Sequence, residues 1–71
     1  MIDNCYLAEL SDTEGDVALY FDNELIEASS DQEAIGKAGD WAASHRLGVV
    51  AMLTVKQGFR GVHSRKIYLG A

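Results

Sequence analysis

Two short segments near the start of the chain place apolar residues at every second position, which is the period of a strand with one buried face. They are residues 5–10 and 17–21, and the polar residues 11–16 between them contain a glycine suited to a hairpin loop. Residues 22–29 scatter apolar residues among acids, so they fit either a short third strand or an irregular approach to the next element. Tyr6, Ala8 and Leu10 are predicted to share one face of the first strand, and Val17, Leu19 and Phe21 are predicted to share one face of the second.

The next segment has the period of a helix and a clear start signal. Ser30 and Glu33 form a capping box, in which the Ser30 hydroxyl accepts from the Glu33 amide and the Glu33 carboxylate accepts from the Ser30 amide. We expect a helix over residues 31–46, with Gly48 as the left-handed residue after its end. Gly36 and Gly39 each oppose this helix by about 1 kcal/mol, so they are either exposed or needed for a close approach. The predicted apolar stripe is Ala34, Ile35, Ala38, Trp41, Ala42 and His45.

Residues 49–55 are apolar at successive positions, which is typical of a central strand covered on both faces. A glycine-bounded turn over residues 57–61 leads to a more polar strand over residues 62–69. The order β-β-(β)-α-β-β predicts an α+β fold, a single two-layer domain over residues 1–71 with one helix on an antiparallel sheet. Because one helix covers only one face of a four-stranded sheet, we expect the second face to be covered by dimerisation.

Composition indicates a small globular domain. The chain is 48% hydrophobic and 24% charged, with no proline and one cysteine, Cys5, which cannot form an internal disulfide. No apolar run approaches the ~20 residues that span a bilayer, and the first residues lack the features of a signal peptide. We therefore expect a cytoplasmic protein without membrane contact.

Charge is divided unevenly along the chain. Residues 1–40 contain all 11 acidic residues and a single base, whereas residues 41–71 contain the other bases and no acid. The net charge of −5 is thus the balance of a strongly acidic and a basic part. Opposite fields of this kind either hold a small fold together, pair two copies, or offer a basic face to a polyanion.

The basic residues concentrate on the predicted last hairpin. With an aromatic residue at its turn and another nearby, this hairpin would supply the charge and stacking that bind a nucleic acid. In the alternative interpretation, the bases pair with acids of the same molecule or of a neighbour, which the negative net charge favours. The candidate interaction surface consists of Lys56, Phe59, Arg60, Arg65, Lys66 and Tyr68.

No local spacing marks a metal site or a catalytic site. The candidate metal ligands, Cys5, His45 and His63, are single residues far apart in the sequence. The alternating acids of residues 12–16 resemble the start of a calcium loop, but the glycine and the glutamate that this motif requires further on are missing. No serine or cysteine has the context of a nucleophile, so we expect no enzymatic activity and no cofactor.

Residues 35–39, Ile-Gly-Lys-Ala-Gly, resemble the I-G-x-x-G loop of KH domains, whose glycines bring backbone amides to phosphates. This resemblance implies nucleic-acid binding at a loop that joins two helices. Asp31, Glu33 and Asp40 surround the segment, however, and would repel phosphate. The capping box and the continuous apolar stripe predict one uninterrupted helix instead.

A second resemblance covers about residues 6–42. The chain shows Tyr6-x-Ala8-Glu9, then Glu14-Gly15, then Leu19-x-Phe21, then Glu33-Ala34 opening a helix with Ala38. This order is similar to that of HicB-type antitoxins, whose ββ(β)αβ partial RNase-H-like domain is non-catalytic and acts through protein contacts. It also looks like short bacterial α+β proteins with the same order of elements. The proline-containing loop of HicB-type antitoxins is missing here.

The sequence therefore predicts a non-catalytic protein that acts through protein–protein contacts, as a homodimer. The alternative is nucleic-acid binding through the basic hairpin 56–66. The two hypotheses differ in where the acids lie. If acids of the first half stand opposite the hairpin bases across neighbouring strands, they neutralise those bases and remove the nucleic-acid surface.

Overall fold

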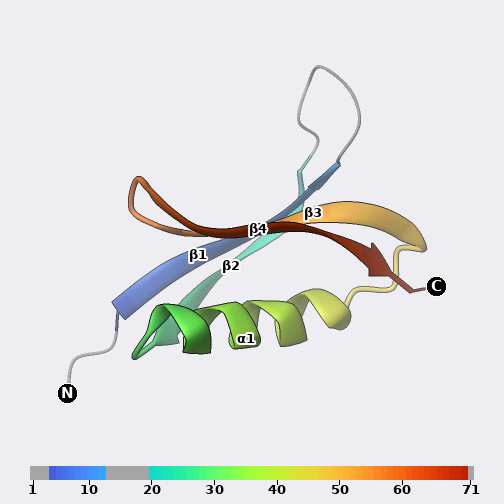
Figure 1. Cartoon of the computed structure of the whole chain (residues 1–71). Coiled ribbons are helices and arrows are strands. Elements are labelled where there is room, and N and C mark those ends of the chain that lie inside the picture. Colours follow the sequence, from blue (N-terminus) through green and yellow to red (C-terminus); the bar gives the residue numbers. More distant parts are fainter. Residues whose placement is uncertain (1–3, 13–19, 71) are drawn as a thin grey trace.

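A computed structural model describes residues 4–12 and 20–70. The described residues form four strands and one helix in the order β-β-α-β-β, which confirms the predicted α+β class. The elements are β1 (Asn4–Asp12), β2 (Tyr20–Ala28), α1 (Asp31–Ala43), β3 (Val49–Gln57) and β4 (Arg60–Leu69) (Figure 1). Most of the predicted hairpin loop and the first part of the predicted strand 17–21 lie outside the described residues.

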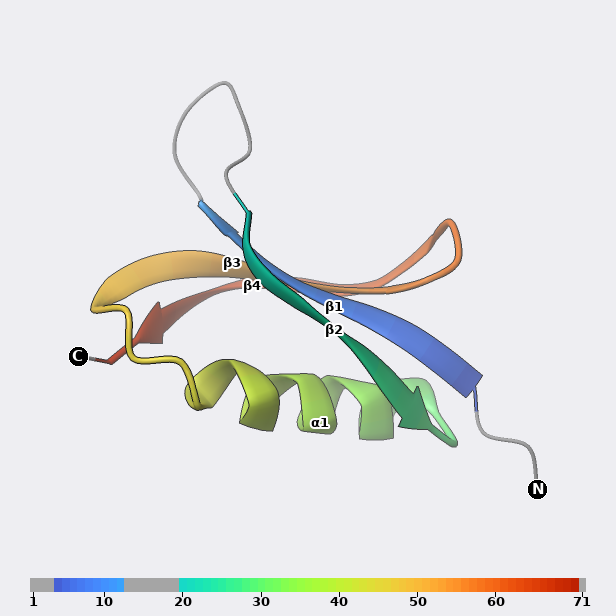
Figure 2. The same cartoon turned by 180° about the vertical axis from the view of Figure 1, so that it is seen from behind.

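The strands form one antiparallel sheet in the order β2-β1-β3-β4, so β2 and β4 are its two edges. α1 connects β2 to β3, with β1 lying between these two strands in the sheet. Figure 1 and the reverse view in Figure 2 show α1 on one side of the sheet, with no described element on the other side. The molecule therefore has two layers, and the sheet face opposite α1 is uncovered.

The core lies between α1 and the sheet. Each central strand contributes alternate residues. The fully buried residues of α1 are all alanines, and the partly buried Trp41 of α1 packs against this core. Small residues on the helix let its backbone lie close to the strands, so the strands supply most of the core volume. The buried residues are Tyr6, Ala8 and Leu10 of β1, Ile26 and Ala28 of β2, Ala34, Ala38 and Ala42 of α1, Ala51, Leu53 and Val55 of β3, and Leu69 of β4. The predicted common face of Tyr6, Ala8 and Leu10 is thus confirmed.

α1 begins as the capping box predicts, with one change of partner. The Ser30 Oγ accepts from the Glu33 N–H at 3.1 Å. The Glu33 carboxylate instead accepts from the Ser29 hydroxyl at 2.8 Å and forms an ion pair with Lys37 at 3.2 Å. Since these contacts supply the first turn with a cap and a negative charge, they satisfy the positive end of the helix dipole.

α1 ends earlier than predicted, at Ala43 rather than at residue 46. Ser44 is its C-cap, and the Ser44 hydroxyl donates to the Trp41 carbonyl at 2.6 Å. Gly48 has the expected positive φ, 68°, but it lies in the connection to β3 and not directly after the helix. The predicted helix was too long because His45 continues the apolar stripe although it lies beyond the end of α1.

α1 runs without a break through both of its glycines, unlike the loop of a KH domain. Gly36 is exposed, and a Cβ atom placed on it would meet nothing within 4 Å. A Cβ atom on Gly39 would stand 3.6 Å from the Nη2 atom of Arg65, which reaches across from β4. Gly36 is therefore tolerated by exposure, while Gly39 lies directly beneath a guanidinium group.

Residues 22–29 are neither a separate strand nor an irregular segment, because β2 extends through Ala28. Only Ile26 and Ala28 of this edge strand are buried, so its sequence shows little periodicity. The register between β1 and β2 shifts after Leu10, where an extra residue of β2 is left unpaired.

The β3–β4 turn is tighter than the predicted turn over residues 57–61. Gln57 and Arg60 are paired, so only Gly58 and Phe59 form the turn. Gly58 has φ 62° at the first central position, as in a type II′ hairpin turn. Val62 is the extra residue of a bulge in β4 and packs against the core.

Candidate functional site

The uncovered face of the sheet is the broad surface on which the candidate site is built. Side chains that alternate with the buried ones point to this face, and the register arranges them in rows across the strands. One row near its middle runs from β2 to β4 through Asn23, Glu9, Thr54 and Ser64. All four are polar, so a polar row crosses this face.

Apolar side chains flank the polar row on both sides. Leu25 and its partner Leu7 lie on one side, while Met52 and the pair of Val50 and Tyr68 lie on the other. Leu25, Val50 and Tyr68 are 67%, 49% and 65% exposed. We call these five residues the apolar flanks. Because α1 covers the opposite face only, they have no layer packed upon them.

An ion pair lies over the polar row. Lys56 Nζ on β3 is 2.8 Å from Glu9 Oε1 on β1, and this contact raises the pKa of Lys56. The Ser64 hydroxyl donates to the Met52 sulfur at 3.2 Å. Since these polar groups satisfy one another within the chain, the apolar flanks are the part of this face that gains most from a partner.

The structure separates the six predicted interaction residues instead of bringing them together. Their positions follow from strand register, in which paired residues share a face and adjacent residues do not. Lys56, Lys66 and Tyr68 lie on the uncovered face, Arg60 and Arg65 lie on the side of α1, and Phe59 stands fully exposed at the β3–β4 turn.

Arg60 is held by an acid from the helix start. Its two terminal nitrogens donate to both carboxylate oxygens of Asp31 at 2.9 Å, and the Tyr6 hydroxyl donates to the same carboxylate at 2.8 Å. The hydrogen bonds from Arg60 and Tyr6 hold the pKa of Asp31 at about 2. The network joins β1, α1 and β4, so the Arg60 guanidinium helps to hold the helix start against the sheet.

Acids of the first half therefore neutralise two of the four hairpin bases, Lys56 and Arg60. Arg65 and Lys66 have no acidic partner within 4.0 Å in the part of the chain that the structure describes. These two residues point to opposite faces of β4 because they are adjacent. The hairpin bases are thus divided between the two faces of the sheet and do not form one continuous surface.

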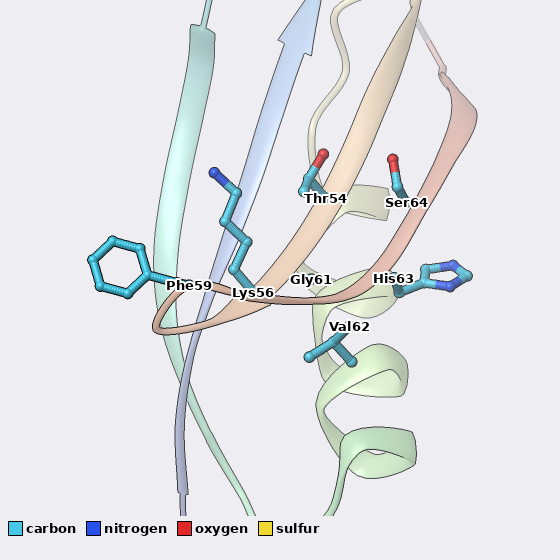
Figure 3. A pocket seen from close by; sticks show the side chains of 7 residues that line it. All are labelled: Thr54, Lys56, Phe59, Gly61, Val62, His63 and Ser64. Carbon is cyan, nitrogen blue, oxygen red and sulfur yellow. The ribbon is translucent and has the colours of Figure 1, made fainter.

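A hollow of about 430 Å³ lies at the β3–β4 hairpin (Figure 3). Gly61 is paired with Lys56, and a Cβ atom on Gly61 would meet nothing within 4 Å, so the missing side chain opens this space. Phe59 and His63 extend in opposite directions from the hairpin. The hollow is lined by Thr54, Lys56, Phe59, Gly61, Val62, His63 and Ser64, a set without a carboxylate.

The predicted metal-ligand candidates do not converge. Cys5 is exposed on β1, His45 follows α1, and His63 lies on β4. Within residues 4–12 and 20–70, no three His, Cys, Asp or Glu side chains gather closely enough to hold a metal ion. Of the acids in residues 12–16, only Asp12 is described.

The buried His63 Nε2 has no hydrogen-bond partner among the described residues. The adjacent Ser64 points to the other face, so the two form no nucleophile–base pair.

The sequence reasoning missed two polar contacts of α1, the Asp31 network at its start and a contact of His45 just after its end. His45 Nε2 lies 2.9 Å from an Asp22 carboxylate oxygen on β2, and His45 Nδ1 lies 3.0 Å from the Trp41 carbonyl. The hydrogen bond to Asp22 raises the pKa of His45. A histidine just past a helix end was the only available signal, since its partner lies in a distant strand.

Comparison with known proteins found no matching family model, no matching curated protein and no matching solved structure. The resemblance to HicB-type antitoxins thus stays a prediction. Among the described residues, no helix has the length and apolar character needed to cross a membrane.

Proposed function

We propose that this protein is a non-catalytic binding protein that acts through protein–protein contacts, and that the uncovered sheet face joins two copies in a homodimer. One observation carries the proposal. The sheet has a single covering layer, yet Leu25, Val50 and Tyr68 on its other face leave about half or more of their surface exposed. Exposed apolar side chains gathered on one face are typical of an interaction surface.

The arrangement of this face suits contact with its own copy. Around a two-fold axis each patch meets itself, so a surface must be self-complementary. The polar row of Asn23, Glu9, Thr54 and Ser64 would meet the partner's polar row, and apolar flanks would meet apolar flanks. Two sheets stacked in this way pack about 10 Å apart.

Two further points support this function. A domain of this length buries only about 60% of the surface of its unfolded chain, so a second apolar layer would stabilise it. The hairpin bases Lys56 and Arg60 are bonded to Glu9 and Asp31, which favours protein contact over nucleic-acid binding. A cytoplasmic location, where thiols stay reduced, suits the single exposed Cys5.

Sedimentation equilibrium of the full chain and two lysine variants tests the proposal. Val50→Lys places a charge on the uncovered face, whereas Ala43→Lys places the same charge on the exposed side of α1. The expected result is a dimer for the natural chain and for Ala43→Lys, and a folded monomer for Val50→Lys. A natural chain that stays monomeric at high concentration, or a Val50→Lys variant that dimerises equally well, contradicts the proposal.

A further inference from the structure

The two edges of the sheet carry charges of opposite sign. β2 contains Asp22, Glu24 and Glu27 and no base, while β4 contains Arg60, Arg65 and Lys66 and no acid. Glu24, Glu27, Arg65 and Lys66 make no ion pair with the described residues. Since β2 and β4 are the outermost strands, the charge division of the sequence becomes a division between two edges.

The register aligns these charges across the sheet. Asp22 is paired with Leu10, Leu10 with Leu53, and Leu53 with Arg65, so one row begins at an acid and ends at a base. The neighbouring row begins at Glu24 on β2 and ends on β4 at His63. If the rows continue into an adjacent molecule, Arg65 faces Asp22 and lies diagonal to Glu24, within reach of a long side chain.

Strand direction permits this continuation. Neighbouring strands are all antiparallel, so β2 and β4 of one molecule run in opposite directions. A copy shifted sideways along the sheet therefore sets its β2 antiparallel to β4 of the first copy. We propose that the basic edge β4 pairs with the acidic edge β2 of a second copy, which extends the sheet head to tail. This interface goes beyond the face-to-face dimer and does not depend on it.

The layer of helices leaves room for such pairing. Four strands at a spacing of about 4.8 Å set neighbouring helices about 19 Å apart, whereas a helix with its side chains is about 10–12 Å wide. At one end of each edge strand the backbone groups cannot form regular hydrogen bonds with a second molecule. Lys37 Nζ donates to the Glu27 carbonyl at 2.7 Å on β2, and Val62 forms the bulge in β4. With Arg65 opposite Asp22, residues 22–24 and 63–65 are the regular segments that meet.

Pairing between like edges is disfavoured. Two β2 edges would bring acids against acids, and two β4 edges would bring bases against bases. Like charges directly opposite each other destabilise a strand pair, and edge charges are a common guard against unwanted pairing. In this sheet the edge charges disfavour pairing of β2 with β2 and of β4 with β4. Pairing of β2 with β4 is the arrangement that both charge and strand direction allow.

Sedimentation velocity with charge-reversed variants tests the proposal. Glu24→Lys makes the acidic edge less acidic and Arg65→Glu makes the basic edge less basic. The matched controls are Asp40→Lys and Arg46→Glu, which change the net charge equally at exposed positions outside β2 and β4. We expect the association constant of this edge contact to fall at least tenfold for each edge variant alone and to stay unchanged for the two controls. An equimolar mixture of the two edge variants should regain most of the association constant of the natural chain.

The measurement is made on Val50→Lys as well as on the natural chain, so that failure of the face-to-face dimer does not affect the result. Raising salt from about 50 mM to about 500 mM should weaken the association, because it screens the charges. Hydrogen exchange at low and high protein concentration gives a readout without an edge variant, since amides of residues 22–24 and 63–65 should slow together. Association equally retained by both edge variants, or exchange at these edges that is independent of concentration, overturns the proposal.

Discussion

The covered and uncovered faces of the sheet are built from alternate residues of the same strands, yet they differ in kind. On the covered face, Leu10, Leu53 and Val55 are fully buried beneath alanines of α1. The uncovered face combines a polar row with the apolar flanks, and its exposed apolar side chains lack a covering layer. The covered face thus accounts for the fold of a single chain, while the uncovered face is the surface on which the proposed interface rests.

Neighbouring residues of β3 give the largest expected contrast between the faces. Leu53→Ala removes a fully buried side chain and should lower the free energy of unfolding by about 2–5 kcal/mol, a large part of a small domain's stability. Met52→Ala, on the uncovered face, should cost less than about 1 kcal/mol in the monomer. Urea unfolding of both variants in the Val50→Lys background measures the difference, and equal losses would show that both faces are buried.

A second contrast concerns the contact between helix and sheet. Ala38→Leu inserts a larger side chain where no surface is exposed and should cost about 1–3 kcal/mol. Ala43→Leu, on the exposed side of α1, should change stability by no more than about 0.5 kcal/mol. Thermal unfolding of the two variants measures this. A tolerated Ala38→Leu would mean that the helix lies farther from the strands than the structure shows.

Local periodicity accounts for the parts of the fold that were predicted correctly. The alternation around Tyr6 and the Ser30 cap each depend on residues close in sequence, so β1 and the start of α1 could be predicted. The edge strand β2 could not be predicted in this way. Most of its residues are exposed on both faces, so its sequence shows almost no alternation of apolar and polar residues. Contact between acids of the first half and the hairpin bases could be named as a possibility, but the sequence did not decide which pair forms. The pairing of Lys56 with Glu9 depends on register between strands far apart in the chain.

The smallest expected effect is a difference in pH dependence between polar contacts of the two faces. The folded-state pKa of Asp31, about 2, lies below the usual value near 3.9, so its ionised form favours folding above about pH 4. This stabilisation disappears as the pH falls toward 2. Tyr6→Phe should therefore flatten the fall in Tm between about pH 4 and pH 2.

Ser64→Ala, which removes the hydrogen bond to Met52 on the uncovered face, serves as the matched control and should leave the fall in Tm between those two pH values unchanged, because neither residue titrates. Circular dichroism melts across this range supply the measurement. Identical acid profiles for Tyr6→Phe and the natural chain would mean that the Tyr6 hydrogen bond does not shift the pKa of Asp31.

The fully buried positions of α1 carry only methyl groups, and Trp41 is the large side chain of the helix that packs against the core. Larger side chains would interlock with the strands and fix where the helix stands along its own axis, but methyl groups offer little resistance to sliding. Polar contacts at the two ends supply that resistance, with Asp31 bound to Tyr6 and Arg60 at the start and His45 bound to Asp22 after the end. The lengthwise position of the helix is thus set by a few hydrogen bonds together with the packing of Trp41, while its distance from the sheet is set by its smallest side chains.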